Sequence, residues 1–372
     1  MRVLHLSFHF AEYAISLSRA LAKDHEVLLV LGRENAAAEL IDRAIAGNPA
    51  SLQVMTLRDY PLKDPRSAGN AIRLLQVIRR FQPDVVHCQE AHRDYLAAVL
   101  PVLRRYPLIL TIHDHKPHSG NDMRVRNRME IYRRWLRKWA DIVIVHGDAI
   151  QKETEELAPG IKGRVLSIPH GPLGQGADLG RVGHPDWEPG HLLFFGRIEK
   201  YKGLGYALDA MDILHSKGRL VHLTIAGRGS DLEPYRKRIQ SNPSCTLREQ
   251  FVPAGDIAEL FRRSHIVVMP YTDATQSGVA AMALNYGRPV IATNVGSVAD
   301  MVHHEQTGLI VPAMDSAALA DAIERLLDNA ELAARFALAA VQMAQWDLSW
   351  DIIARQTTSA YRHAIRHHDS TT

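Results

Sequence analysis

Three cations lie close together in a short segment bounded by two glycines. Arg197, Lys200 and Lys202 stand between Gly196 and Gly203. A guanidinium group can bind phosphate oxygens in a bidentate manner, and an ammonium group binds them as a point charge. A phosphate-bearing ligand is therefore the first hypothesis, and a solvated basic loop without a ligand is the alternative.

The residues on either side of this segment indicate where it lies in a fold. Residues 192–195 form an apolar run that suits a buried parallel strand, and apolar residues recur at helical spacing from Leu204 to Met211. A strand, a cationic loop and a helix place the loop at the carboxyl edge of a sheet. Ligands bind at that edge, and the free amides at the start of the helix attract anions.

A second segment suited to phosphate follows the strand predicted at 266–269. It runs from Pro270 to Gly278 and enters a helix predicted at 279–286, so that its amides can cap a phosphate. Ser277 is also suited to cap the helix whatever the ligand, and the two roles are compatible. The residues expected to bind the ligand here are Gln276, Ser277, Gly278 and Val279.

The length and composition of the whole chain limit its class. A chain of 372 residues exceeds the size of one hydrophobic core, which predicts two domains, and a net charge of +3 argues against extensive nucleic-acid binding. Cys88 and Cys245 lie far apart, so we expect no disulfide and a cytoplasmic location. We also expect no export leader and no membrane span, because no apolar run of about 18 residues is present.

Apolar strands alternate with helical patterns along both halves of the chain. This alternation predicts an α/β protein with two doubly wound parallel sheets. The N-terminal domain is expected over residues 1–172, a Gly- and Pro-rich linker over 173–190 and the C-terminal domain over 191–349. A final helix, about 350–372, is expected to return to the first domain. A ligand site between two such domains is the usual arrangement.

An ordered series of short motifs resembles one family. Gly196-Arg197-Ile198 followed by Lys202-Gly203 is similar to the G-R-[LI]-x-x-x-K-G signature of retaining nucleotide-sugar glycosyltransferases of family 4. Ala226-Gly227-Arg228-Gly229 is similar to the family's strand that ends in G-x-G, and Gly287-Arg288-Pro289 follows in the expected order. The match covers residues 190–330, and the order of the pieces makes it specific.

The resemblance implies a fold, a reaction and a role for the cations. The fold is GT-B, with two Rossmann-like domains facing across a cleft, and the reaction is retaining transfer of a sugar from a nucleotide-diphosphate donor to an acceptor hydroxyl. Arg197 and Lys202 would stabilise the charge on the departing diphosphate, so no metal or other cofactor is expected. Gly196 and Gly227 would contact the donor. The acceptor, a small molecule, a glycan or a lipid-linked compound, would bind the N-terminal domain.

One histidine of the first half also belongs to the resemblance. Thr111-Ile112-His113-Asp114 is similar to a T-x-H segment that faces the donor sugar in the family. His113 is expected to hydrogen-bond a sugar hydroxyl or to help move the acceptor proton, with Asp114 beside it, and a buried structural histidine is the alternative. No zinc-type spacing of His and Cys is present, and neighbouring side chains of the His-rich segment 113–118 point in different directions on a loop. We therefore expect no metal site.

The sequence departs from the family pattern at a pair of glutamates separated by seven residues. The first falls at Ala274, where Asp273 is the nearest carboxylate and is expected to replace it. The second, which binds the ribose, falls at Met282 and is missing. This departure keeps a non-catalytic relative, acting as a binding or scaffolding subunit, as the alternative function. A nicotinamide-dependent dehydrogenase is a weaker hypothesis still, because the glycine motif for dinucleotide binding is incomplete.

Residues 122–139 form a basic helix candidate that also contains Trp135 and Trp139. We expect a solvated basic face with its aromatic side chains in the core. The alternative is a surface for an anionic acceptor, or for peripheral contact with the inner face of a membrane.

Overall fold

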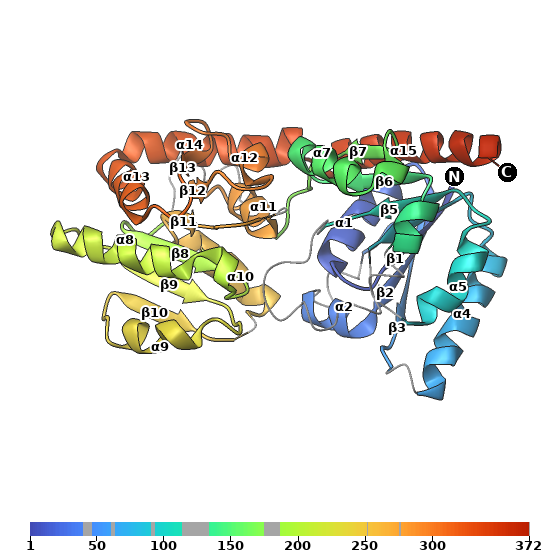
Figure 1. The fold of residues 1–372 in the computed structure, drawn as a ribbon, viewed down its shortest axis with the longest axis horizontal. Helices are drawn as coiled ribbons and strands as arrows, with labels where there is room; N and C mark the ends of the chain where they lie inside the picture. Colours follow the sequence, from blue (N-terminus) through green and yellow to red (C-terminus); the bar gives the residue numbers. More distant parts are fainter. Residues whose placement is uncertain are drawn as a thin grey trace. The chain divides into compact units, whose positions relative to one another are not determined.

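A computed structural model of the chain describes residues 1–39, 47–60, 64–90, 94–113, 134–174, 187–250, 252–274 and 277–371. These residues divide into two compact units (Figure 1). Unit 1 contains the described residues up to Gly171 together with those from Trp350 onward, and unit 2 contains the described residues from Pro172 to Ser349. Residues 114–133 and 175–186 lie outside the described ranges, so most of the segment 122–139 and of the predicted linker does too.

Unit 1 is built on a sheet that has seven parallel strands within the described residues. Their spatial order is β3-β2-β1-β4-β5-β6-β7, so the direction of winding reverses between β1 and β4. The central strands are buried along almost their whole length, which is why they read as continuous Val, Ile and Leu runs. The strands are β1 (Arg2–Ser7), β2 (Glu26–Gly32), β3 (Leu52–Leu57), β4 (Val85–Gln89), β5 (Leu108–Thr111), β6 (Ile142–Val145) and β7 (Val165–Ser167).

Helices cover this sheet, and local sequence signals set where they begin. For example, the side chain of Asp64 accepts a hydrogen bond from the amide of Arg66, and Pro65 occupies the first turn of α4. Among the described residues, the helices of unit 1 are α1 (Ala11–Leu21), α2 (Arg33–Glu39), α4 (Pro65–Phe81), α5 (Asp94–Leu103), α7 (Asp148–Leu157) and α15 (Trp350–Thr371).

The last helix of the chain, α15, is part of unit 1. It packs against α1, β5 and β6 (Figure 1). Its Tyr361 is fully buried, and the hydroxyl of Tyr361 lies 2.9 Å from Nδ1 of His87 on β4. The other ring nitrogen of His87, Nε2, lies 2.7 Å from the hydroxyl oxygen of Thr111 on β5. The helix therefore contributes both apolar packing and a hydrogen bond to the interior of the first sheet.

Unit 2 contains a second parallel sheet, with six strands among the described residues. The order β10-β9-β8-β11-β12-β13 again reverses its winding, here between β8 and β11. The strands are β8 (His191–Phe195), β9 (His222–Ala226), β10 (Cys245–Arg248), β11 (Ile266–Met269), β12 (Val290–Thr293) and β13 (Gly308–Val311).

Two hydrophobic clusters cover the two faces of this second sheet. Leu192 and Phe194 of β8 point into one cluster, whereas Leu193 points into the other, as the alternation of side chains along a strand requires. The flanking helices are α8 (Leu204–Ser216), α9 (Glu233–Gln240), α10 (Ala254–Arg263), α11 (Gly278–Asn285), α12 (Val298–Met301), α13 (Ser316–Asp328) and α14 (Ala330–Gln342).

The predicted fold class, α/β with two doubly wound sheets, is confirmed, and a few elements differ from the sequence patterns. Four elements were not predicted, namely α2, α7, β7 and α14. Strand β7 has three residues, α7 is rich in charged residues, and much of the buried face of α14 consists of alanine, so each gives a weak periodic signal.

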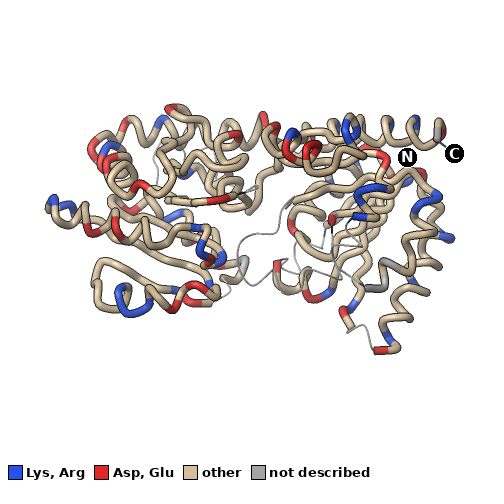
Figure 2. Tube along the Cα trace, viewed as in Figure 1, with Lys and Arg blue, Asp and Glu red and all other residues tan. Residues whose placement is uncertain are grey.

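Charged residues of both signs are interspersed along both units (Figure 2). Among the described residues, no helix combines the length and the apolar character needed to cross a bilayer.

We predict that Tyr361→Ala destabilises unit 1 strongly. Truncating a fully buried aromatic side chain costs about 3 to 5 kcal/mol, and this substitution also removes the partner of His87 Nδ1. Hydrogen exchange of the β1 and β4 amides reports the free energy of opening this sheet. Arg362→Ala, at the next and exposed position of α15, is the control and should change this free energy by less than about 0.5 kcal/mol. Equal effects of the two substitutions would contradict the packing of α15 in unit 1.

Candidate functional site

The loops that follow β8 and β11 lie where the second sheet reverses its winding. In doubly wound sheets, this switch point at the carboxyl edge of the strands is where ligands bind. The loop after β8 contains Arg197 and ends in a short 3-10 helix, Lys200–Lys202, before α8. The loop after β11 leads into α11. The topology therefore brings both predicted phosphate segments to one edge of unit 2.

Two glycines allow the β8 and β9 loops to approach closely. Gly196 has a φ of 106°, and a Cβ atom there would lie 3.3 Å from Nζ of Lys202 and 3.4 Å from Cγ2 of Val279. A Cβ atom at Gly227 would lie only 1.9 Å from the carbonyl oxygen of Gly196. Any side chain at Gly227 would therefore push apart the two loops, which are joined by a 3.0 Å hydrogen bond from the Gly196 amide to the Ala226 carbonyl.

The ammonium group of Lys202 is held inside unit 2 by an aromatic side chain. Lys202 is only 7% exposed, and its Nζ donates a 2.8 Å hydrogen bond to the hydroxyl of Tyr271. The same Nζ lies 4.5 Å from the centroid of the Tyr271 ring, a distance at which the ring face attracts a cation. Burial raises the pKa of the Tyr271 hydroxyl, so this group stays neutral and can accept the hydrogen bond.

Polar contacts continue from Tyr271 to the start of α11. The hydroxyl of Tyr271 interacts with the hydroxyl of Ser277, which is buried. Ser277 is the N-cap of α11, and its Oγ accepts a hydrogen bond of 3.4 Å from the amide of Ala280. The cation, the phenol and the helix N-terminus therefore form one connected group. The backbone amides of Gly278 and Val279 belong to the first turn of α11, where amides have no hydrogen-bond partner within the helix.

Only some of the site residues predicted for unit 2 lie close together in the structure. It brings together Gly196, Lys202, Gly227, Ser277, Gly278 and Val279. Arg197 and Asp273 are exposed on the same two loops, and Gln276 lies outside the described residues. Ala274 and Met282, which occupy the places of the two glutamates, are buried and half-buried, and both pack with apolar neighbours.

His113 follows β5 in unit 1 and is enclosed there. Its ring is 3% exposed and stacks on the ring of Phe10 with 3.9 Å between centroids. Its Nε2 lies 2.7 Å from Oε1 of Gln89, at the end of β4. Burial lowers the pKa of His113 well below its usual value, and His146 and His170 nearby lower it further. His113 is therefore a neutral imidazole, and the neighbouring Asp114 lies outside the described residues.

Sequence reasoning missed the two histidines that lie beside His113. His146 follows β6, His170 lies three residues after β7, and both are 3% exposed. Burial lowers the pKa of His146 to about 4 and that of His170 to about 3. The available signal was that three successive strands are each followed by a histidine within three residues. Parallel strands that are neighbours in a sheet bring such residues together.

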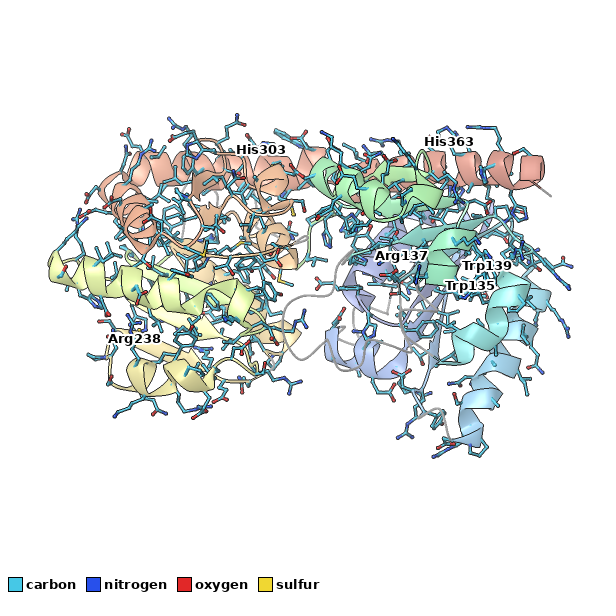
Figure 3. The ribbon with its side chains drawn as sticks, in the orientation of Figure 1. Trp135, Arg137, Trp139, Arg238, His303 and His363 are labelled. Atoms are coloured by element: carbon cyan, nitrogen blue, oxygen red, sulfur yellow. The ribbon has the colours of Figure 1, made fainter. Side chains whose placement is uncertain are left out.

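The described part of the basic segment contains one ion pair, and its other two basic residues, Arg134 and Lys138, are exposed. Residues 134–139 are helical, and Nε of Arg137 lies 2.7 Å from the carboxylate of Glu90, which is almost fully buried. Trp139 packs against the core, and its ring lies 5.1 Å from that of Trp135 (Figure 3). Trp135 is 46% exposed, so the expectation that both aromatic side chains lie in the core was wrong for Trp135.

Comparisons with known proteins match almost the whole chain. The profile described as "Glycosyltransferase Family 4" matches residues 11–171, and the one described as "Glycosyl transferases group 1" matches residues 189–329. A glycogen synthase of Mycobacterium tuberculosis is 29% identical over 311 residues, which cover 80% of this chain and 73% of that protein.

Solved structures show the same architecture. HepE of Anabaena in complex with UDP-glucose has a TM-score of 0.70 and 18% identity, with 97% of this chain and 99% of that one covered. The catalytic domain of starch synthase IV from Arabidopsis thaliana, bound to ADP and acarbose, has a TM-score of 0.71 and 13% identity, with 98% and 99% covered. The two doubly wound units are thus those of the GT-B fold.

The fold identifies the class of protein, and the two profile matches identify its family. The protein is a GT-B glycosyltransferase. The chain belongs to glycosyltransferase family 4, in agreement with the motif series that begins at Gly196.

We predict that Tyr271 and Lys202 stabilise unit 2 as a coupled pair. Tyr271→Phe keeps the ring but removes the hydrogen bond to a charged group, which should cost about 1.5 to 3 kcal/mol. In a Lys202→Met background, the same substitution should cost much less, because the ammonium that needs the hydroxyl is gone. Urea titration with hydrogen exchange of the β8 and β11 amides measures both costs.

Tyr206→Phe, which removes a half-buried hydroxyl from α8, is the matched control for this cycle. Its cost should be the same with Lys202 and with Met at that position. If the cost of Tyr271→Phe were also unchanged, the contact between the two side chains would contribute nothing to stability.

Proposed function

We propose that the chain transfers a sugar from a nucleotide-diphosphate donor to an acceptor hydroxyl, with retention of configuration and without a metal at the phosphates. The observation that carries this proposal is the buried ammonium of Lys202, in the loop after β8. Tyr271 holds this group and links it to the N-terminus of α11. A fixed cation joined to the start of a helix suits an anion with several oxygens, such as a diphosphate.

The named relatives support a nucleotide-sugar donor and leave its base open. The HepE structure contains UDP-glucose, and the starch synthase IV structure contains ADP and acarbose. These ligands belong to those proteins, and for this chain we propose only the shared part, a nucleoside diphosphate that carries a sugar. For the acceptor we propose a hydroxyl of a small molecule, a glycan or a lipid-linked compound.

The proposed chemistry gives the cations the main role. As the bond between the sugar and the phosphate breaks, its electron pair stays on the phosphate oxygen, and Arg197 and Lys202 stabilise the added negative charge. The acceptor hydroxyl attacks from the same face of the sugar, and the departing phosphate oxygen takes its proton. This route needs no carboxylate nucleophile.

The other predicted site residues have different roles in the proposal, and one of them has none. The amides of Ser277, Gly278 and Val279 are proposed to bind the phosphates together with Gln276, and Asp273 to lie near the transferred sugar. Asp114 is proposed to face the same sugar. His113 carries no step in this mechanism, because its Nε2 already faces Gln89 and its ring lies against Phe10.

We predict that Lys202→Ala and Arg197→Ala each lower turnover by about a hundredfold or more, as the loss of one charge-stabilising group commonly does. Lys200→Ala removes an exposed cation from the same loop and serves as the matched control. It should retain turnover within about threefold, because general loop charge is screened by solvent. Near-normal turnover of both Lys202→Ala and Arg197→Ala would refute the phosphate assignment.

The donor base can be identified by thermal-shift measurements with UDP, GDP, ADP, dTDP and CDP, each with and without Mg²⁺. We expect one nucleotide to raise the melting temperature, because a ligand that binds only the folded state stabilises it. The shift should not require Mg²⁺ and should disappear in Lys202→Ala. If no nucleotide stabilises the chain, the missing ribose carboxylate at Met282 outweighs the retained cations, and the alternative of a non-catalytic binding or scaffolding subunit takes precedence.

A further inference from the structure

Three histidines from neighbouring strand ends meet inside unit 1. His113, His146 and His170 each offer one ring nitrogen, and these three atoms all lie within 4.8 Å of one another. The rings are also close, with centroids 4.9 Å apart for His113 and His146, and 5.0 Å apart for His146 and His170. All three side chains are 3% exposed. We refer to these residues as the histidine triad.

Backbone carbonyls fix the tautomers of two members of the triad. Nδ1 of His146 lies 2.8 Å from the carbonyl oxygen of Ile168, and Nδ1 of His170 lies 2.7 Å from that of Gly171. A carbonyl oxygen can only accept a hydrogen bond, so Nδ1 carries the proton in both rings. In a neutral imidazole the other nitrogen, Nε2, then carries the lone pair.

A hydrogen-bonded chain fixes the third member in the opposite tautomer. The amide nitrogen of Gln89 donates to Nε2 of His5 at 2.9 Å, and Nδ1 of His5 lies 2.8 Å from the hydroxyl of Ser18. With its amide nitrogen used in this way, Gln89 turns its oxygen toward Nε2 of His113, at 2.7 Å. His113 therefore donates through Nε2 and carries its lone pair on Nδ1.

The three lone pairs cannot satisfy one another. In these tautomers each ring has used its only proton on an outer partner, so no member of the triad can donate to another. Nδ1 of His113 and Nε2 of His146 are both buried and have no hydrogen-bond partner. A buried nitrogen lone pair without a hydrogen-bond donor costs free energy. A metal ion, which accepts electron pairs, could bind all three lone pairs at once.

We propose that the histidine triad binds one divalent metal ion of the zinc type. Neutral imidazoles suit Zn²⁺ and its neighbours in the transition series, whereas Mg²⁺ and Ca²⁺ prefer oxygen ligands. In metal-binding histidines the second ring nitrogen usually donates to a carbonyl or a similar acceptor. His146 and His170 donate to carbonyls in this way, and His113 donates to the side-chain amide oxygen of Gln89.

The distances between the three ring nitrogens exceed those in a metal-bound site, and rotation of the side chains can shorten them. Zinc bonds of about 2.0 to 2.1 Å in a tetrahedral site place the ligand nitrogens about 3.3 Å apart, compared with the limit of 4.8 Å in this structure. His113 and His170 lie in loops beyond their strands, so their rings can turn inward without moving the sheet. Three protein ligands leave a fourth position for water or another small ligand.

The metal would have a structural role. Phe10 and Tyr13 pack against the triad, the Tyr13 ring lying between 5.0 and 5.5 Å from each imidazole ring. These aromatic rings limit the access of water, and the ion would join the ends of β5, β6 and β7. The inference goes beyond the proposed function, because it involves no phosphate of the donor and assigns His113 a ligand role instead of a sugar contact.

Metal content of the chain without a His tag tests the proposal. We expect about one Zn²⁺ per wild-type chain after equilibration with one equivalent and dialysis, and less than about one fifth of that in His146→Ala and in His170→Ala. Gln89→Leu keeps all three ligands and removes an outer partner, so its affinity for Zn²⁺ should fall by about ten- to a hundredfold. His363→Ala, at an exposed position of α15 in the same unit (Figure 3), is the control for surface binding and should retain full content.

A second measurement makes the test independent of how well the variants fold. X-ray absorption of the wild-type zinc protein, and the visible spectrum of its Co²⁺ form, should show a four-coordinate site with about three imidazoles and no sulfur. The proposal is overturned if the wild type retains less than about one fifth of an equivalent, if the spectra show an oxygen-only shell, or if folded His146→Ala and His170→Ala keep the metal. It is equally overturned if His363→Ala removes the metal.

Discussion

An ammonium group inside a protein needs partners for both its charge and its hydrogens, and Lys202 meets this requirement in unit 2 through Tyr271. Much of the local backbone depends on that contact. Gly196 leaves room for Nζ, and Ser277 joins the phenol to the first turn of α11. The cation therefore has a fixed position before any ligand arrives, which is the kind of preorganisation that makes electrostatic stabilisation effective.

The sequence predicted those features whose partners lie nearby in the chain. Buried parallel strands read as apolar runs, and β11 was located to the residue, with Pro270 directly after its end. The cationic loop was visible for the same reason. The role of Tyr271 was not, because 69 residues separate it from Lys202. The histidine triad was missed because a local spacing rule cannot detect ligands contributed by three different strands.

The two units share a topology but use their interiors differently. Unit 2 has an apolar cluster on each face of its sheet, and Lys202, Tyr271 and Ser277 are in contact near the switch point between β8 and β11. Unit 1 carries a polar row across its central strands instead. His5 and His87 are register partners on β1 and β4 and stack 4.7 Å apart, and Gln89 and Thr111 are partners on β4 and β5. Strand register thus brings these side chains close enough to stack and to hydrogen-bond across neighbouring strands.

The position of α15 has a consequence for how the chain is made. The helix completes unit 1, yet all of unit 2 is translated before it, and Tyr361 lies 274 residues after its partner His87. On the ribosome, unit 2 can finish folding while the polar row of unit 1 still lacks one wall. Truncation from the carboxyl end would therefore damage the amino-terminal unit first, and an isolated fragment of unit 1 would need α15 supplied as a separate peptide.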